Sequence, residues 1–481
     1  MPASSSDTEL AQPRIPQTIR RTPVNILRMT APQHRRLNSH LFPGDGKEAV
    51  AVALCGRGEG GDRSLWTVNQ IVEIPYEECI RSPDAVTWPT RRLKALLSSA
   101  GHAGMGILKI HSHPGGYDAF SDADDRSDVE LFEAVARRLP GEHVSAVMLP
   151  DGRIFARIVN GASLGKRIER VSVVGDDLVF WNSAPETERQ DFDLRHRQMF
   201  GDRTTNLLAT LSVAVVGVSG TGSPTVEILM RLGVGRIILI EPDHVEAKNL
   251  NRIYGAKRSD ADAKRNKAEM MRDHVLACGL GTVVEICPKR VDSPEAIALL
   301  STCDIVIGCV DSVEGRDVLN RIATFYSLPY FDLGVRLDAD GEGGVASVSA
   351  AVHFLQPGGS SLRSRGVYTE ADLYAEYLSR TDPAFYEDQV RRGYVRGVRV
   401  DRPAVISINT AVSAAAVNEL LARIHPYRTS HNREFAIQKL LFAHGRTTHR
   451  PDGEPDTELA QHVGRGTCRP LLMLPRLDRA A

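Results

Sequence analysis

The hydrophobic and polar positions in the first half of the chain predict a small α+β unit. Five short runs show either alternating or continuous apolar character, which is typical of β-strands, and two longer segments show helical periodicity. The predicted strands are residues 49–54, 64–74, 106–110, 144–149 and 154–158, and the predicted helices are residues 90–100 and 124–139.

The second half alternates buried-strand runs with helices. An apolar run at 211–217 meets a glycine-rich turn, and an apolar-periodic helix at 224–232 and a strand at 236–241 follow it. This order predicts a βαβ unit. A further strand is predicted at 304–310, and residues 404–424 are predicted to form a strand that runs into an alanine-rich helix. The predicted fold class is therefore α/β, with an N-terminal α+β domain followed by a Rossmann-like domain whose sheet is mainly parallel.

Segments without periodicity divide the chain. Its 481 residues exceed what one hydrophobic core usually organises, which supports two domains. We predict a flexible N-terminus at 1–35, with order beginning near Leu37, and a linker at 166–195, where the stretch from 181 is polar and aperiodic. The two domains then span 36–165 and 196–443. The remaining residues, 444–481, mix glycine, proline, threonine and charge, and are predicted to be a loosely ordered tail.

Composition excludes several classes of protein. Charged residues make up 25% of the chain, and 59 basic residues almost balance 60 acidic ones, so nothing indicates a nucleic-acid or membrane partner. No apolar run approaches the length of a membrane span, and the N-terminus does not resemble a secretory signal. Seven cysteines without a C-x-x-C pair indicate a reducing compartment, so we predict a cytoplasmic protein.

A first group of polar residues predicts a metal site. His111 and His113 are two residues apart at the end of a predicted strand, so both imidazoles face one side, and Asp124 begins the next helix. Three protein ligands and a water form the catalytic zinc arrangement, in which the pKa of the water falls to about 7. Glu48, an acid at the start of an apolar strand, is the candidate base. Residues 121–124 also match a capping box that would only start the helix.

The segment H-S-H, followed by seven residues that begin with Pro114 and then by S-x-x-D, resembles the signature of the JAB/MPN (JAMM) metallopeptidase family. The resemblance implies that His111, His113 and Asp124 bind one Zn²⁺, that Glu48 activates the water, and that Ser121 helps to hold the developing oxyanion. Members of this family cut peptide or isopeptide bonds after the C-terminal glycine of ubiquitin-like proteins, or trim their precursors. The resemblance implies a substrate of the same class.

A second group predicts a nucleotide site. Gly217, Gly220 and Gly222 lie in the turn after the strand at 211–217, and Glu241 ends the next strand. Glycines allow the backbone to approach phosphate, the helix N-terminus favours negative charge, and an acid at this position accepts hydrogen bonds from ribose. The pattern alone suits NAD nearly as well as ATP.

The residues after Glu241 favour a triphosphate. Asn249 adds an amide donor, and Arg252 and Lys267 add two cations, which a triphosphate needs more than a dinucleotide does. Asp311, at the end of the strand at 304–310, has the carboxylate oxygens that Mg²⁺ prefers. Taken singly, Arg252 or Lys267 would be an ordinary surface charge.

These residues resemble the ThiF/MoeB-type family, which shares its adenylation domain with ubiquitin-activating enzymes, and the likeness runs from about residue 197 to 425. It implies ATP and Mg²⁺ as cofactors and attack of a carrier protein's C-terminal carboxylate on the α-phosphate, with release of pyrophosphate. By this resemblance Gly217, Gly220 and Gly222 form the glycine loop, and Glu241 is the ribose-binding acid. Asn249 and Arg252 contact phosphate, Lys267 is the triphosphate lysine, and Asp311 is the metal-side aspartate. Arg197 matches an arginine that reaches into the partner's site in homodimeric relatives, so a homodimer is implied.

Two departures from the ThiF/MoeB pattern bear on the chemistry. Where relatives hold a structural zinc through C-x-x-C pairs, this chain has Ser361 to Ser364, so we predict no zinc in this domain. No cysteine lies between Cys309 and Cys468, the region where a thioester-forming cysteine usually occurs, and Cys468 is the one loosely placed candidate. Our hypothesis is that the enzyme stops at the acyl-adenylate or passes it to a separate cysteine or sulfur donor.

The two groups together predict a bifunctional enzyme. A zinc-dependent (iso)peptidase would process or deconjugate a ubiquitin-like protein, and an adenylation domain would activate its C-terminal glycine, with a separate conjugating protein in a conjugation pathway. One alternative is processing and activation of a sulfur-carrier protein for cofactor or metabolite biosynthesis. Another is an active peptidase on a non-catalytic adenylation-like scaffold. A nicotinamide-dependent oxidoreductase explains only the glycine turn and Glu241.

Overall fold

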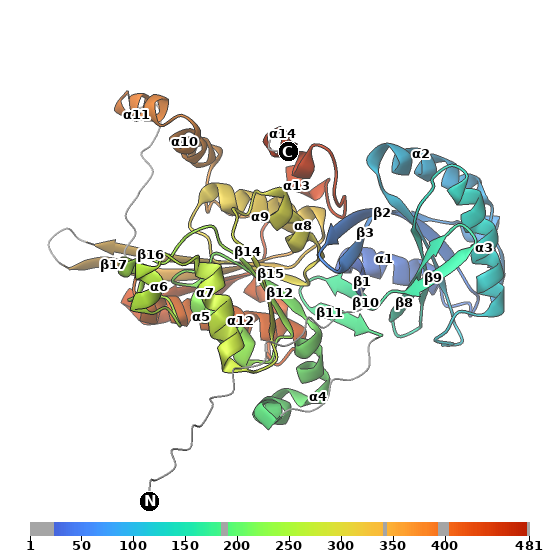
Figure 1. Ribbon diagram of the computed structural model, residues 1–481. Helices are drawn as coiled ribbons and strands as arrows, with labels where there is room; N and C mark the ends of the chain where they lie inside the picture. Colours follow the sequence, from blue (N-terminus) through green and yellow to red (C-terminus); the bar gives the residue numbers. More distant parts are fainter. Residues whose placement is uncertain (1–23, 184–190, 340–343, 393–403, 479–481) are drawn as a thin grey trace, which may run out of the picture.

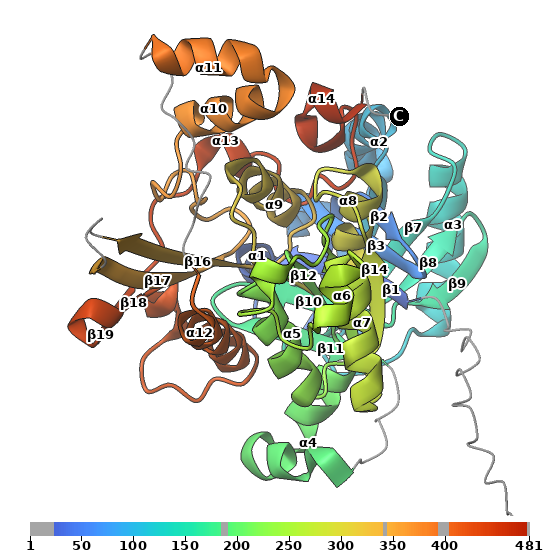
Figure 2. The same cartoon turned by 60° about the vertical axis from the view of Figure 1, so that its left-hand side comes forward.

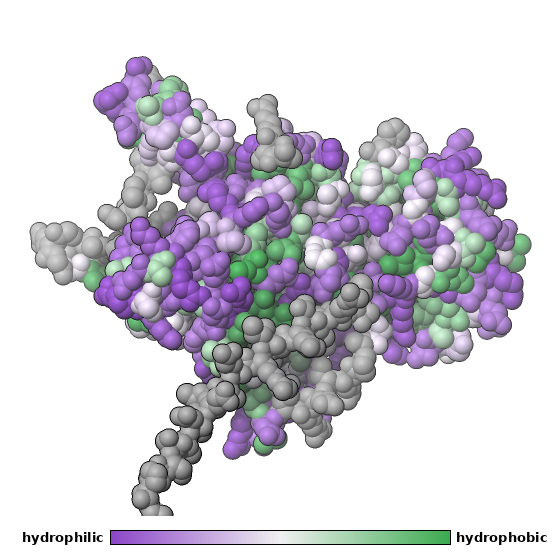
Figure 3. Space-filling model, viewed as in Figure 1, coloured by the Kyte–Doolittle hydropathy of each residue, from purple (hydrophilic) through white to green (hydrophobic). Residues whose placement is uncertain are grey.

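The computed structural model describes residues 24–183, 191–339, 344–392 and 404–478. Two large sheets, each covered by helices, form two units that lie side by side (Figure 1). Among the described residues, no helix is long and apolar enough to cross a membrane. Hydrophilic residues cover most of the face shown in Figure 3, which places the apolar side chains of both units inside.

The N-terminal unit is built on a nine-stranded sheet with the order β11-β10-β1-β3-β2-β6-β7-β8-β9. Its strands are β1 (Val24–Thr30), β2 (Val50–Gly60), β3 (Arg63–Glu73), β6 (Gly106–Ser112), β7 (His143–Met148), β8 (Ile154–Asn160), β9 (Ser163–Arg167), β10 (Arg170–Val174) and β11 (Leu178–Asn182). Helix α1 (Ala31–Leu41) packs on one face, and α2 (Leu93–Ala103) and α3 (Asp122–Ala136) pack together on the other. A short hairpin of β4 (Ile80–Ser82) and β5 (Ala85–Thr87) lies beside α2.

The C-terminal unit is built on an eight-stranded sheet with the order β14-β13-β12-β15-β16-β17-β18-β19. The first five strands in this order are parallel, and the last three are antiparallel. The strands are β12 (Ser212–Val216), β13 (Arg236–Ile240), β14 (Val283–Cys287), β15 (Ile305–Gly308), β16 (Tyr330–Ala339), β17 (Val345–Leu355), β18 (Ile437–Leu441) and β19 (Arg446–Arg450). Strands β16 and β17 project together beyond the rest of the sheet (Figure 2).

Helices cover both faces of this second sheet. The helices of this unit, of which α10 and α11 lie away from the sheet, are α4 (Leu194–Thr210), α5 (Gly222–Arg231), α6 (Arg258–Asp262), α7 (Lys267–Cys278), α8 (Pro294–Thr302), α9 (Val313–Phe325), α10 (Glu370–Thr381), α11 (Pro383–Arg391), α12 (Ile406–Ile424), α13 (Thr457–Ala460) and α14 (Pro475–Asp478). Val213 and Val215 face the cluster with α5 and α12, while Ala214 and Val216 face the cluster with α8 and α9. Because both faces are covered, β12 is a continuous apolar run, and the predicted Rossmann-like parallel sheet is confirmed.

The two units share one apolar interface. Ile26 of β1 and Leu65 of β3 belong to the same buried cluster as Ala214 of β12 and residues of α8. Helix α8 lies directly on β2, where a Cβ added to Gly60 would come 2.2 Å from the carbonyl oxygen of Ala298. Only glycine at this position permits the close approach of the helix backbone, so the sequence of β2 is adapted to the contact.

A buried charge cluster lies inside the same interface. The carboxylate of Asp304, just before β15, accepts hydrogen bonds from Arg63 at 3.0 and 3.1 Å and from Arg170, both in the N-terminal unit. Arg28 of β1 donates to the carbonyl oxygens of Tyr326 and Cys303. Burial lowers the pKa of Arg28 to about 10, although Asp304 opposes this shift. Asp304 therefore partly compensates three buried guanidinium groups.

The prediction of a flexible segment at 1–35 is wrong for residues 24–35. Strand β1 lies between β10 and β3, and α1 follows it at once. Residues 1–23 lie outside the described residues. The predicted linker at 166–195 is also wrong for β10 and β11, which complete the first sheet, and for the start of α4, while residues 184–190 lie outside the described residues. These strands form because neighbouring strands satisfy their backbone groups.

The prediction of a loosely ordered tail at 444–481 is wrong as far as residue 478. Strand β19 pairs with β18, and Asp456 accepts a hydrogen bond from Ser361 at 2.6 Å. Arg365 donates to Asp452 at 2.8 Å. Hydrogen bonds and an ion pair therefore fix residues 361–365, the stretch where relatives of the ThiF/MoeB type were expected to have C-x-x-C. Cys468 is buried in the shared core, which corrects its placement as a loose candidate. The predicted strand within 404–424 is absent from the described residues 404–424, where α12 begins at Ile406.

Candidate functional sites

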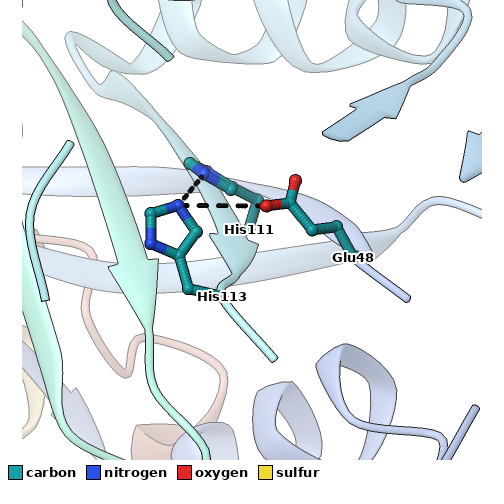
Figure 4. A group of neighbouring side chains, drawn as sticks. All are labelled: Glu48, His111 and His113. Carbon is teal, nitrogen blue, oxygen red and sulfur yellow. Dashed lines mark hydrogen bonds and ion pairs between the residues drawn. The ribbon is translucent and has the colours of Figure 1, made fainter. Parts of the chain in front are cut away.

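The first predicted site lies at the end of β6 in the N-terminal unit. His111 is paired with Val50 of β2, which places Glu48, just before that strand, next to the imidazoles. The two Nε2 atoms are 3.1 Å apart, and Glu48 Oε1 is 3.9 Å from His113 Nε2 (Figure 4). Asp124, in the first turn of α3, places Oδ1 2.8 Å from His111 Nε2 and Oδ2 3.3 Å from His113 Nε2. All four residues are therefore close together, and each is buried.

The donor atoms fit a zinc ion. His113 Nδ1 donates to the carbonyl oxygen of Tyr117 at 2.7 Å, which leaves the lone pair of Nε2 directed at the other ligands. Two nitrogen ligands at about 2.0–2.1 Å from a tetrahedral zinc lie about 3.3 Å apart, close to the observed 3.1 Å between His111 and His113. Two imidazoles and a carboxylate are ligands that zinc commonly takes. His111 Nδ1 has no hydrogen-bond partner among the described residues.

Ser121 is joined to Asp124 by a capping box. Ser121 Oγ accepts from the Asp124 amide at 3.1 Å and donates to Asp124 Oδ2 at 2.8 Å. Burial raises the pKa of Asp124, but hydrogen bonds with His111 and His113 outweigh it and hold that pKa well below its usual range. The carboxylate is therefore ionised, as a metal ligand must be.

Glu48 has the opposite titration behaviour. Burial raises its pKa to about 7, and the nearby carboxylate of Asp124 adds to this effect while His113 opposes it. Its backbone is fixed by a hydrogen bond from its amide to the Ser82 carbonyl at 2.8 Å and by Arg81, which donates to the Glu48 carbonyl at 2.7 Å. A carboxyl group with a pKa near neutrality can both take and return a proton at the working pH.

A buried ion network that sequence reasoning missed supports these ligands. Lys109, two residues before His111, donates to Asp128 of α3 at 2.7 Å. Arg157 of β8 donates to the same carboxylate at 2.6 Å and to Asp125 at 2.5 Å. The network ties β6, which carries His111, to α3, which carries Asp124. Lys109 and Arg157 are charged residues within otherwise apolar strand patterns, and this signal in the sequence could have revealed the network.

The second predicted site lies at the carboxyl end of β12, where the chain turns into α5. Gly217 adopts φ +88°, and a Cβ added to Gly222 would come 1.8 Å from the Gly217 carbonyl oxygen. Glu241 accepts hydrogen bonds from the amides of Val218 at 2.7 Å and Asp243 at 3.0 Å, and burial raises its pKa. The strand, the glycine turn and the acid are therefore arranged as in nucleotide-binding βαβ units.

Two cations lie around this turn. A Cβ added to Gly220 would be 3.4 Å from Cδ of Arg252, so the arginine side chain lies against the loop. Lys267, at the start of α7, donates to Asp243 at 3.1 Å, close to Glu241 in the chain. Asn249 uses its side-chain oxygen to accept from the Glu246 amide at 3.0 Å.

Two predicted residues stand apart from the loop contacts. Asp311 follows β15, whose neighbour is β12, so it lies at the same edge of the sheet and is exposed. Arg197 of α4 is bound instead by Asp193, with distances of 2.7 and 2.8 Å, and by Asp202 at 3.0 Å. The described chain does not bring Arg197 into contact with its own glycine loop.

Sequence reasoning missed two residues of α12 that hold the glycine loop. Ser413 donates to the carbonyl oxygen of Thr221 at 2.7 Å, and a Cβ on Gly220 would come 2.4 Å from Nδ2 of Asn409. Asn409 is 3% exposed. Buried polar side chains in an alanine-rich helix are the signal that could have identified them.

Curated relatives match this second unit in part. Ubiquitin-like modifier-activating enzyme 5 of Culex quinquefasciatus is 33% identical over 156 residues, which cover 31% of this chain and 37% of that protein. Sulfur carrier protein adenylyltransferase of Thermus thermophilus is 31% identical over 147 residues, which cover 29% of this chain and 53% of that protein. The match therefore spans about a third to a half of the length of these relatives.

Among solved structures, E. coli MccB with succinimide aligns at a TM-score of 0.42 and 17% identity, covering 56% of this chain and 73% of that one. The model of the ThiF family matches residues 194–458, more than half of the chain. The matched region contains the glycine turn, Glu241, Arg252 and Lys267 in the arrangement described above. The chain belongs to the ThiF family.

Proposed function

We propose that this chain uses ATP to adenylate the C-terminal glycine of a ubiquitin-like or sulfur-carrier protein. The grouping of the glycine turn, Glu241, Arg252 and Lys267 within a ThiF-family domain carries the proposal. Backbone amides at the start of α5 and the two cations bind the phosphates, and Glu241 accepts from the ribose. Gly217, Gly220, Gly222, Asn249 and Asp311 complete the set, with Asp311 as the residue that would hold Mg²⁺.

In the proposed reaction, an oxygen of the carrier's C-terminal carboxylate attacks the α-phosphorus of ATP. The bond from that phosphorus to the bridging oxygen of the β-phosphate breaks, so pyrophosphate leaves and an acyl-adenylate forms. Arg252 and Lys267 stabilise the charge that develops on the phosphates. The family match favours this chemistry over a nicotinamide-dependent oxidoreductase.

Both classes of carrier have support. One relative is a ubiquitin-like modifier-activating enzyme and another a sulfur carrier protein adenylyltransferase. The Thermus thermophilus relative supports activation of a sulfur carrier, and a separate conjugating protein belongs only to the other pathway. Burial raises the pKa of Cys303 and of Cys309 to about 12, which disfavours thiolate attack by either and supports an enzyme that stops at the acyl-adenylate. A homodimer in which Arg197 reaches the partner's site stays a prediction.

Replacing Arg252 by alanine is expected to slow ATP–pyrophosphate exchange by about 100- to 1,000-fold, because one positioned charge on the phosphates is lost. Exchange is measured with labelled pyrophosphate and candidate carrier proteins that end in glycine. Arg258→Ala removes an exposed arginine of the nearby helix α6 and should leave the rate unchanged. Equal rates in wild type and Arg252→Ala would contradict the assigned role of Arg252.

We propose further that the nine-stranded sheet and its helices form a zinc-dependent peptidase of the JAB/MPN type. The close grouping of Glu48, His111, His113 and Asp124 supports this assignment. The two histidines and Asp124 would hold the ion, which when bound supplies a Lewis acid that polarises a carbonyl group and lowers the pKa of water. Glu48 accepts and returns the proton, and Ser121, whose hydroxyl donates to Asp124, would turn that proton toward the oxyanion.

The zinc assignment is tested by metal content. The wild-type chain is expected to contain about one zinc per chain, and His113→Ala is expected to lose the zinc together with cleavage of a carrier fusion extended beyond its glycine. His431→Ala removes an exposed histidine of the other unit and should keep both. Elemental analysis of the purified proteins measures the metal independently of activity. Full zinc occupancy in His113→Ala would exclude this residue as a ligand.

A further inference from the structure

A groove of about 950 Å³ leads away from the proposed zinc site. It is lined at one end by Glu48, His111 and Asp124. From there it follows α3 on one side and α2 with the β4–β5 hairpin on the other, and Figure 1 shows these two helices next to each other at the outer end of the N-terminal unit. The groove is therefore continuous with the site where bond cleavage is proposed.

The length of the groove follows from α3. Asp124 lines it near the start of this helix, and Arg138 lines it just beyond the end. At a rise of about 1.5 Å per residue, these positions are about 20 Å apart along the helix axis. An extended chain covers about 3.3 Å per residue, so the groove accommodates about six residues of peptide in the extended conformation.

The rim of the groove carries unpaired positive charge. Lys94 of α2, Arg126 of α3, and Arg137 and Arg138 just after α3 line the groove, and all four are exposed. Within the described part of the chain, none of the four forms an ion pair or a side-chain hydrogen bond. Two other cations of the lining are paired with carboxylates, because Glu78 binds Arg91 and Asp128 binds Lys109.

The lining of the groove also contains acidic and apolar residues. Glu130 lines the groove along α3, whereas Asp84 lies close enough to Glu48 to raise the pKa of that carboxyl, so four cations of the lining face two carboxylates outside the metal site. Val86, Trp88 and Leu97 form half-buried apolar positions between the charged ones. An extended peptide presents alternate side chains to opposite sides, so one that alternates apolar and acidic residues matches both features.

We propose that this groove binds a segment of about six residues of the substrate protein that carries acidic side chains next to the scissile bond. The proposal rests on the peptidase function proposed above and adds a charge preference to it. Arg126 lies about half a turn from Asp124 and meets an acid near the cleavage point, whereas Arg137 and Arg138 meet one at the far end. The rim charges raise the rate of encounter and disfavour basic segments.

The test compares two fluorescein-labelled octapeptides that begin with Gly-Gly and continue with alternating leucine and aspartate or alternating leucine and lysine. Their binding to zinc-loaded Glu48→Gln chain is measured by fluorescence anisotropy. The acidic peptide is expected to bind at least about tenfold more tightly, and the difference should shrink as salt rises from about 0.05 to 0.5 M.

Variants identify the groove as the origin of the preference. The double substitution Arg137→Glu and Arg138→Glu is expected to abolish it, and Lys94→Glu, on the opposite wall, is expected to weaken acidic-peptide binding about threefold. The matched control, Arg433→Glu with Arg446→Glu, changes two exposed arginines of the other unit and should keep the preference. Equal affinity for both peptides, or a preference that survives the groove substitutions, would overturn the proposal.

This test separates the groove from the peptidase function. A chain that cuts a carrier fusion with no dependence on charge would remove the groove proposal alone. If the chain binds no zinc but prefers the acidic peptide, and the variant with Arg137→Glu and Arg138→Glu loses that preference, the groove proposal is supported and the peptidase function is excluded.

Discussion

Replacing Glu48 by glutamine is expected to slow cleavage of a carrier fusion by about 100- to 10,000-fold, the usual contribution of a general base. Glutamine keeps the size of the side chain but cannot take up a proton. Because His111, His113 and Asp124 already supply three ligands, zinc content should stay at the wild-type level. The measurements are kcat/KM for the fusion and zinc per chain in the same preparation.

The matched control is Glu73→Gln, which changes a surface glutamate that pairs with Arg36. It should cleave as fast as the wild type. ATP–pyrophosphate exchange should be equal in all three proteins, because Glu48 lies in the other unit from the glycine turn. Cleavage by Glu48→Gln at the wild-type rate would show that another group takes the proton.

Replacing Asp304 by asparagine is expected to lower the free energy of unfolding by about 3–5 kcal/mol. The substitution preserves shape but removes the negative charge between Arg63 and Arg170, which remain buried at 6% and 4% exposure. Among the described residues, the hydrogen-bond partners of Arg28 are carbonyl oxygens, so it loses the same compensation. Urea denaturation followed by circular dichroism measures the change.

A surface ion pair provides the comparison for Asp304. Asp151 pairs with Arg153, and both side chains are 54% exposed, so Asp151→Asn should change stability by less than about 1 kcal/mol. Because Asp304 joins the two units, its replacement should also separate their unfolding into two transitions. Equal denaturation curves for the two variants would mean that the apolar contacts alone hold the units together.

The zinc-type site could be predicted because its residues follow one another closely in the chain. His111 lies in β6, His113 directly follows that strand, and Asp124 lies in the first turn of the next helix, so local geometry already brings them together. Glu48 lies beside the histidines because β2, which it precedes, is the neighbour of β6 in the sheet. The nucleotide turn was equally local, since a strand, a turn and a helix N-terminus are consecutive.

Features that depend on distant partners could not be predicted in this way. Strand β1 contains Arg28, a charge that interrupts its apolar run, and its compensating carboxylate, Asp304, lies in the other unit. Asn409 reaches the glycine loop from α12, which no local pattern relates to that turn. The segment after residue 444 has the composition of a loop, but Asp452 and Asp456 find their partners on another part of the chain.

The interface between the two units can form fully only after synthesis has reached residues near Val463. The side chain of Asn69 on β3 donates to the carbonyl oxygen of Val463, a residue 394 positions later. At about 5–20 residues per second, a ribosome reaches Val463 about 20 to 80 s after Asn69. Ile26, Leu65 and Gly60 stay uncovered until α8 has been made, and Gly56 stays uncovered until Arg465 has been made. The nascent N-terminal unit must therefore be shielded from aggregation until the rest of the chain arrives.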